Sequence, residues 1–231
     1  MPDKNFFPVL TPQEPNGKEV SSEEAEKILL EKLAIHERLV ERTILDLACL
    51  NSNIGRPEKA AHYINRLMTS TDDPEKKAFY LLAMGCSMEK MRKYEEAIIY
   101  YSQGLLLEPS NSETWYFINN NLGFCLNYFN KYVEAEPYCR AAIKINPHHH
   151  NAYKNLGISM EGQDKYPEAA VLYIKAVETN ARDSRALVLL EELFEKHEAI
   201  KYDFPDIHAE IEKCREAVRL ANRTQPDMNN N

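Results

Sequence analysis

The sequence predicts an all-α solenoid, an array in which one helical hairpin follows another. Three near-copies of one pentapeptide carry this prediction: Lys93-Tyr94-Glu95-Glu96-Ala97, Lys131-Tyr132-Val133-Glu134-Ala135 and Lys165-Tyr166-Pro167-Glu168-Ala169. Their alanines lie 38 and 34 residues apart. A fixed period of about 20 to 50 residues is typical of units that need a neighbour to bury their apolar face. The small number of glycines, 7 in 231 residues, agrees with helices joined by short turns.

Each unit reads as two helices with apolar stripes. In the clearest unit the first stripe precedes a turn at Lys93-Tyr94, and the second helix ends at Pro109, whose ring cannot continue the hydrogen-bond ladder. Small residues in the stripes allow the two helix backbones to approach closely. The stripe residues are Leu81, Met84, Gly85, Met88, Ala97, Tyr101 and Gly104, then Leu122, Gly123, Leu126, Ala135, Cys139, Ala142 and Pro147, then Tyr153, Leu156, Gly157, Met160, Ala169, Tyr173 and Ala176.

This pattern resembles the tetratricopeptide repeat (TPR) family, whose unit of about 34 residues carries Leu-Gly in its first helix and alanines with an aromatic residue in its second. The resemblance covers residues 78–183 and implies a right-handed α-solenoid of helical hairpins, the TPR superhelix. Clear repeats are expected at about 78–111, 116–149 and 150–183. Weaker patterns predict degenerate units at about 41–74 and 184–222, so that the helical array extends over 21–223.

The two ends of the chain are expected to differ from the array. Residues 1–20 hold four of the 12 prolines and are expected to form a flexible arm. Ser21 and Glu24 form a capping box, and no glycine or proline follows until Gly55, so one long helix, or two stacked end to end, is predicted from about 22 to 53. The tail 224–231 is expected to be disordered.

Composition narrows the class of partner and the compartment. A net charge of -8 and a pI of about 5.5 argue against nucleic acid, since phosphate binding needs clustered Lys and Arg. The short apolar patch near the N-terminus is too small for a signal peptide or a membrane span. We therefore expect a cytoplasmic protein without membrane insertion. Five cysteines, with no CxxC pair, indicate reduced, buried thiols inside the helical patterns.

The sequence offers no chemistry for catalysis. It contains no nucleophile with a base, no glycine-rich phosphate loop and no HExxH motif, so we expect no enzyme, no catalytic residues and no cofactor. Three consecutive histidines, 148–150, follow Pro147 and invite a metal site. Consecutive side chains do not converge on one ion without further ligands, so a solvated loop without metal is the preferred interpretation.

The resemblance implies that the first helices of the hairpins line a concave groove that binds a peptide or an extended segment of a partner protein. Projection of these helices predicts the residues that face the groove. They are Phe79, Leu82, Cys86, Phe117, Asn120, Asn121, Phe124, Tyr128, Asn151, Lys154, Asn155 and Ile158.

Asparagines stand out within this predicted set. Three in succession, 119–121, interrupt a helical pattern although asparagine is a poor helix former. Asn121 and Asn155 occupy equivalent places in successive repeats, and an amide can both donate to and accept from the backbone of an extended peptide. The alternative is that these amides are solvated or cap carbonyls. Some family members hold a chaperone's C-terminal carboxylate with a set of Lys, Arg and Asn. Only Asn121 matches that set, so this clamp is not expected.

The function predicted from these observations is a non-catalytic protein-protein interaction scaffold that binds an extended peptide segment in its groove. The alternatives are a self-associating structural module and a secretion or pilus-assembly chaperone. The apolar run Phe6-Phe7-Pro8-Val9-Leu10 adds a hypothesis of self-association, in which the arm docks in its own groove or a neighbour's. The alternative is a tail that contacts nothing.

Overall fold

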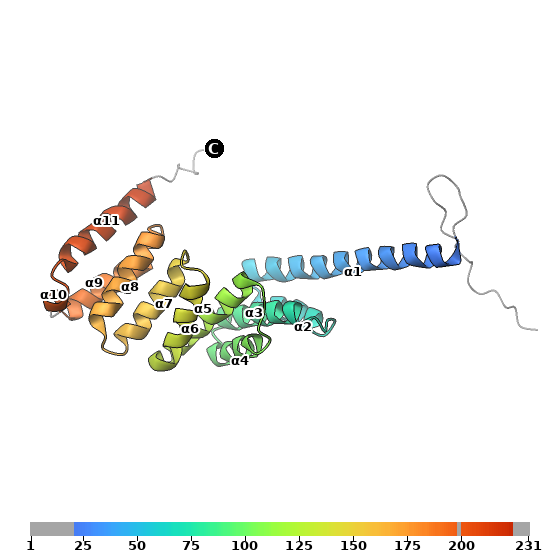
Figure 1. Cartoon of the computed structure of the whole chain (residues 1–231), viewed down its shortest axis with the longest axis horizontal. Coiled ribbons are helices and arrows are strands. Elements are labelled where there is room, and N and C mark those ends of the chain that lie inside the picture. The colour runs from blue at the N-terminus through green and yellow to red at the C-terminus, as the bar shows by residue number, and fades with distance from the viewer. Residues whose placement is uncertain (1–20, 198–199, 224–231) are drawn as a thin grey trace, which may run out of the picture.

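The computed structural model describes residues 21–197 and 200–223, and every regular element in those ranges is an α-helix (Figure 1). The prediction of an all-α solenoid of hairpins is confirmed. The predicted arm and tail, 1–20 and 224–231, lie outside the described residues. The helices are α1 (Ser22–Asn53), α2 (Pro57–Met68), α3 (Pro74–Lys90), α4 (Tyr94–Leu105), α5 (Ser112–Tyr128), α6 (Tyr132–Ile145), α7 (His150–Glu161), α8 (Tyr166–Thr179), α9 (Arg185–Lys196), α10 (Ile200–Asp203) and α11 (Ile207–Arg223).

The three central hairpins, α3–α4, α5–α6 and α7–α8, close with the same turn. A non-glycine residue in each turn takes a left-handed backbone conformation: Arg92 at φ 61°, Asn130 at 59° and Asp164 at 60°. The lysine that follows donates its amide N–H back to the end of the first helix, as in a Schellman motif. These bonds join Lys93 to Met88, Lys131 to Leu126 and Lys165 to Met160, at 2.9, 3.0 and 3.0 Å. The repeated Lys-Tyr pair therefore marks the place where the second helix begins.

Small residues bring the two helices of each hairpin together. A Cβ on Gly85 would lie 2.3 Å from the ring of Tyr101, and a Cβ on Gly157 would lie 2.5 Å from the ring of Tyr173. Gly123 faces the Cys139 thiol in the same way, at 2.5 Å. No side chain fits at these positions without moving the ring or the sulfur. The alanines of the three pentapeptides are fully buried opposite them: Ala97, Ala135 and Ala169.

Helix α1 is the 32-residue helix that the capping box predicts. Its first turn is capped by Ser21, whose hydroxyl accepts from the Glu24 amide at 3.3 Å. The second half of α1 packs on α2 and α3, where Ile44 and Ala48 are buried. The first half projects beyond the array (Figure 1). Because α1 is covered only in part, Cys49 is exposed, and the expectation of a buried role is wrong for this thiol.

The C-terminal end of the array is formed by α9, α10 and α11. Helix α11 packs on α8 and α9 with one apolar face, and its other face carries charged side chains. The four-residue helix α10 lies between α9 and α11. The residues that α11 buries in the core shared with α8 and α9 are Ile207, Ile211, Cys214 and Val218.

Candidate functional site

The first helices of successive hairpins lie side by side, and α5 shows how their faces are used. Gly123 faces α6, Ile118 faces Gly104 of α4, and Asn120 faces α7. These contacts cover three sides of the helix. The remaining side forms one stripe of the candidate groove, and its residues are spaced by three or four: Phe117, Asn121, Phe124 and Tyr128.

The predicted groove residues differ widely in exposure. Phe79 and Tyr128 are open to solvent, at 44% and 55%. Leu82, Asn120, Lys154 and Asn155 are buried, with at most 8% exposed. The adjacent helices pack closely enough to cover most of these four side chains, so the predicted set is not one open surface, and its role in binding a ligand stays a prediction. The half-buried members are Cys86, Phe117, Asn121, Phe124, Asn151 and Ile158.

The amides of Asn121 and Asn155 are engaged within the protein. Asn155 Nδ2 donates to Asn120 Oδ1 at 3.1 Å, which joins α7 to α5. Its Oδ1 is buried and has no hydrogen-bond partner in the described structure. Asn121 Nδ2 lies 3.3 Å from the Tyr101 hydroxyl and 3.5 Å from Cys86 Sγ. The hypothesis that both amides are reserved for a ligand needs correction: Asn155 is a structural residue, and only half-buried Asn121 reaches the groove surface.

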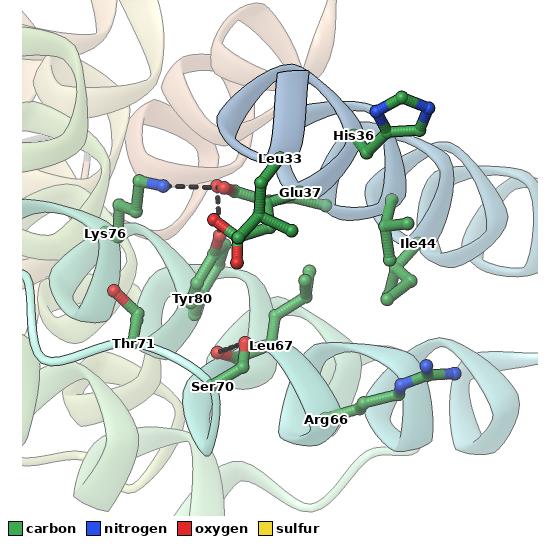
Figure 2. A pocket seen from close by; sticks show the side chains of 12 residues that line it. Leu33, His36, Glu37, Ile44, Arg66, Leu67, Ser70, Thr71, Lys76 and Tyr80 are labelled. Carbon is green, nitrogen blue, oxygen red and sulfur yellow. Dashed lines mark hydrogen bonds and ion pairs between the residues drawn. The ribbon is translucent and has the colours of Figure 1, made fainter. Parts of the chain in front are cut away.

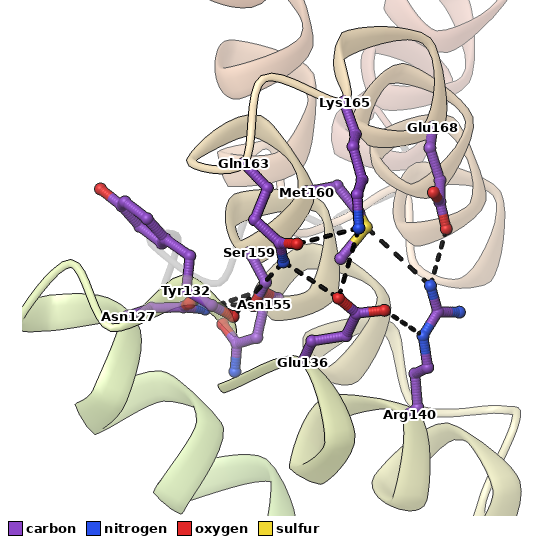
Figure 3. Close-up of polar contacts among 10 residues, drawn as sticks. All are labelled: Asn127, Tyr132, Glu136, Arg140, Asn155, Ser159, Met160, Gln163, Lys165 and Glu168. Carbon is purple, nitrogen blue, oxygen red and sulfur yellow. Dashed lines mark hydrogen bonds and ion pairs between the residues drawn. The ribbon is translucent and has the colours of Figure 1, made fainter. Parts of the chain in front are cut away.

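More polar contacts join the same repeats (Figure 3). Asn127 of α5 donates to the Asn155 carbonyl oxygen at 2.7 Å and accepts from the Ser159 hydroxyl at 2.9 Å. Near the hairpin turns, Glu136 accepts from Arg140 at 2.8 Å and from Gln163 at 3.0 Å. The Gln163 hydrogen bond is the main reason that the pKa of Glu136 is lowered. These contacts fix the angle between the α5–α6 and α7–α8 hairpins.

A second buried cluster lies between α3, α4 and α5. The Glu89 carboxylate accepts from the Tyr101 hydroxyl and lies 3.8 Å from Cys125 Sγ. Burial raises the pKa of Glu89 and also raises the pKa of the Cys86 and Cys125 thiols. A thiol must ionise to act as a nucleophile. The cluster thus keeps both thiols protonated, and their role is to pack between the three helices.

The most unusual charge on the groove side is Lys154 of α7. Its side chain is buried, with 8% exposed, yet it has no hydrogen bond or ion pair with any described residue. Burial lowers the pKa of Lys154 to about 8, and the nearby positive charge of Arg185 contributes, while Asp183 opposes the change. Arg185 is itself bonded to Asp183 and donates to Asn151 Oδ1 at 3.2 Å. The side chains of Lys154, Asn151 and the paired Arg185 and Asp183 form a charged cluster on the side of the candidate groove.

Arg185 and Asp183 were not among the residues predicted from the sequence. Arg185 lies 34 residues after Asn151, one full repeat, so the period itself would have placed it on the same side of the next first helix. Asp183 also binds His150, whose Nε2 is 2.8 Å from Oδ2. His149 stacks on Tyr116 with ring centroids 4.5 Å apart. The interpretation of 148–150 as a solvated loop is therefore wrong for His149 and His150. The described residues contain no cluster of three potential metal ligands.

Comparison with known proteins agrees with this architecture. Residues 80–111 match the tetratricopeptide repeat family model. The Caenorhabditis elegans tetratricopeptide repeat-containing protein trd-1 is 25% identical over 143 residues, 62% of this chain and 18% of that protein. Rat RNA polymerase II-associated protein 3 is 23% identical over 185 residues, 78% of this chain and 28% of that protein. The chain thus spans less than a third of the length of these relatives.

Solved structures show the same fold. MamA residues 41 to the end, from Desulfovibrio magneticus RS-1, superpose with a TM-score of 0.60 at 20% identity, covering 81% of this chain and 97% of that one. The first TPR domain of human RPAP3 superposes with a TM-score of 0.50 at 24% identity, covering 56% of this chain and 98% of that one. None of the described helices is long and apolar enough to cross a membrane. On this evidence the chain carries a tetratricopeptide repeat at residues 80–111, within a helical array that has the TPR solenoid fold.

Proposed function

We propose that this chain is a non-catalytic interaction protein that binds an extended segment of a partner protein across the first helices α5, α7 and α9. An acidic group of that segment lies against Lys154. The partner is a protein or peptide, and the cytoplasm is the compartment we infer for it. The observation that carries this proposal is the Lys154 side chain, which is only 8% exposed and has no hydrogen bond or ion pair of its own among the described residues.

A buried charge without a partner is costly, and proteins rarely retain one unless it is used. Lys154 is held near a second cation, Arg185, which adds to the cost instead of relieving it. A carboxylate placed between these two groups would accept charge-assisted hydrogen bonds from both. The arrangement therefore suits a glutamate, an aspartate or a terminal carboxylate of the bound segment.

The rest of the groove suits the body of such a segment. Phe117 and Phe124 of α5 offer half-buried apolar surface, and Tyr128 at the end of the helix is exposed. Tyr128 packs on Tyr94 of α4, with ring centroids 4.1 Å apart, so the two rings form a firm apolar rim. Half-buried Asn121 lies in the same stripe. We infer a partner segment in which apolar side chains contact α5 and an acidic group reaches α7.

A peptide array tests this proposal with a matched pair of variants. Random dodecamers are probed with the wild-type chain, with Lys154→Met and with Lys144→Met, in which an exposed lysine of α6 is replaced. Wild type and Lys144→Met should select the same peptides, enriched in Asp and Glu beside apolar residues, and Lys154→Met should lose them. Retention of those acidic peptides by Lys154→Met, with equal intensity, would show that the groove does not use this lysine.

A further inference from the structure

A cavity of about 580 Å³ opens between α1 and the adjoining ends of α2 and α3 (Figure 2). The α1 wall holds the apolar residues Leu33, Val40 and Ile44 and the polar residues His36, Glu37 and Glu41, and Leu67 and Tyr80 belong to the opposite side. Among the lining residues, the Glu41 carboxylate accepts from Lys76 Nζ at 2.6 Å and from the Tyr80 hydroxyl at 2.7 Å. These two bonds pin α1 to α3, so the cavity has firm walls.

The apolar face that lines this cavity continues along α1 beyond the array. Leu33 and Val40 are seven residues apart, and Ile44 follows one turn later, so the three share one side of the helix. Ile44 is buried in the array, whereas Leu33 and Val40 are 54% and 52% exposed. Leu30, on the same side and one turn earlier, is 58% exposed. Exposed apolar side chains that share one side of a helix make that side a candidate contact site.

We propose that residues 6–10 of the same chain, Phe6-Phe7-Pro8-Val9-Leu10, occupy this cavity. The occupant is argued from chain length and from the point where the N-terminal segment joins the structure. Ser21 stands at the start of α1, so the arm leaves from the free end of the helix that carries the exposed face. The arm must therefore fold back along α1 to reach the cavity.

The distances permit this path. At 1.5 Å per residue, Leu33 lies ~18 Å and Ile44 ~35 Å along the helix from Ser21. Val9 precedes Ser21 by 12 residues, which span at most ~40 Å when extended. Proline restricts its own backbone and that of the residue before it to extended conformations, so the sequence with Pro8, Pro12 and Pro15 favours a long reach. Tethering gives the apolar run an effective concentration of about millimolar at the cavity.

This placement differs from docking in the groove. The arm covers α1, and the groove stays free for a partner. Phe6, Phe7, Val9 and Leu10 supply apolar surface for the side chains of Leu30, Leu33 and Val40. The inference does not depend on Lys154 or on any bound partner, so it can fail or succeed independently of the proposed function.

Photo-crosslinking of the full-length chain tests the inference. The photoreactive residue p-benzoylphenylalanine replaces Phe7, and mass spectrometry maps the adducts after irradiation of dilute monomer. We expect adducts within one chain, at α1 between Leu30 and Ile44 or at the facing segment around Leu67. Adducts on Phe117 or Phe124 would place the arm in the groove, adducts between two chains would place it on another copy, and an absence of adducts would mean no contact. Each of these three results overturns the proposal.

A matched pair of double variants separates the cavity face from the rest of α1. Leu33→Asp with Val40→Asp should remove most of the intramolecular adduct, because both carboxylates would enter the apolar contact. Ile35→Asp with Leu39→Asp changes two residues of similar exposure, 61% and 63%, that do not line the cavity. This second pair should leave the adduct unchanged. Equal loss in both pairs, with helicity by circular dichroism intact, contradicts a specific site.

Discussion

Replacing Lys154 by methionine should make the protein more stable at neutral pH. Methionine fills a similar volume without a charge, so the variant avoids the cost of holding an ammonium group in a buried place. That cost can be worked from the pKa, which burial, with a contribution from Arg185, lowers from 10.5 to about 8. At 1.36 kcal/mol per pH unit, this difference corresponds to roughly 3 kcal/mol of unfolding free energy.

The sign of the pH dependence follows from the same values. Below pH 8 Lys154 is protonated in both the folded and the unfolded chain, and the full cost is present. Between pH 8 and 10.5 the folded chain has lost this proton while the unfolded chain still holds it, so stability rises with pH. Above pH 10.5 the cost has disappeared. The advantage of Lys154→Met should therefore be greatest at pH 7 and vanish near pH 10.5.

Urea denaturation of wild type, Lys154→Met and Lys144→Met at pH 7, 9 and 10.5 measures this effect. Comparison with the wild type at each pH cancels the titration of every other group, and Lys144→Met controls for the loss of one surface charge. A Lys154→Met variant that is less stable than the wild type at pH 7, or an advantage that does not change with pH, would show that Lys154 is compensated in solution. The reasoning about the groove would then lose its basis.

Three further changes test the fold. Gly123→Leu should lower the free energy of unfolding by about 1 to 3 kcal/mol, because its side chain meets the Cys139 thiol, and an unchanged urea midpoint would place the hairpin contact elsewhere. Arg92→Gly should raise the free energy of unfolding by up to about 1 kcal/mol, since glycine adopts the left-handed φ of 61° without strain. A lower free energy of unfolding in this variant would mean that the arginine side chain stabilises the turn. Asn155→Ala should lower the melting temperature by removing the donor to Asn120, and its stability should match the wild type only if that bond is absent in solution.

The fold could be predicted because its signals are local and repeated. A buried alanine such as Ala135 and a glycine such as Gly123 must recur wherever two helix backbones meet, and the recurrence appears directly as a period. The long first helix could be predicted equally well, because a capping residue marks its start and no glycine or proline interrupts it. Neither inference requires knowledge of how one hairpin is placed on the next.

The candidate site depended on that placement, and here the sequence was less informative. Periodicity identifies a stripe on a first helix, but it does not say how closely the next first helix approaches. Asn155 lies on the side of α7 that α5 covers, so its amide is used between helices. The same projection predicts Lys154 on the groove side, but periodicity does not show that this side chain is buried and has no partner among the described residues.

The charged outer face of α11 makes the C-terminal end of the array different from the N-terminal end. A further hairpin stacked on that end would have to bury side chains such as Lys213 and Arg215, which already pair with Glu210 and Glu191 on the surface. The opposite end presents the leucines of α1 instead. Extension of the superhelix by another protein is thus disfavoured at the C-terminal end, and at the N-terminal end it would have to displace the arm from the leucines of α1.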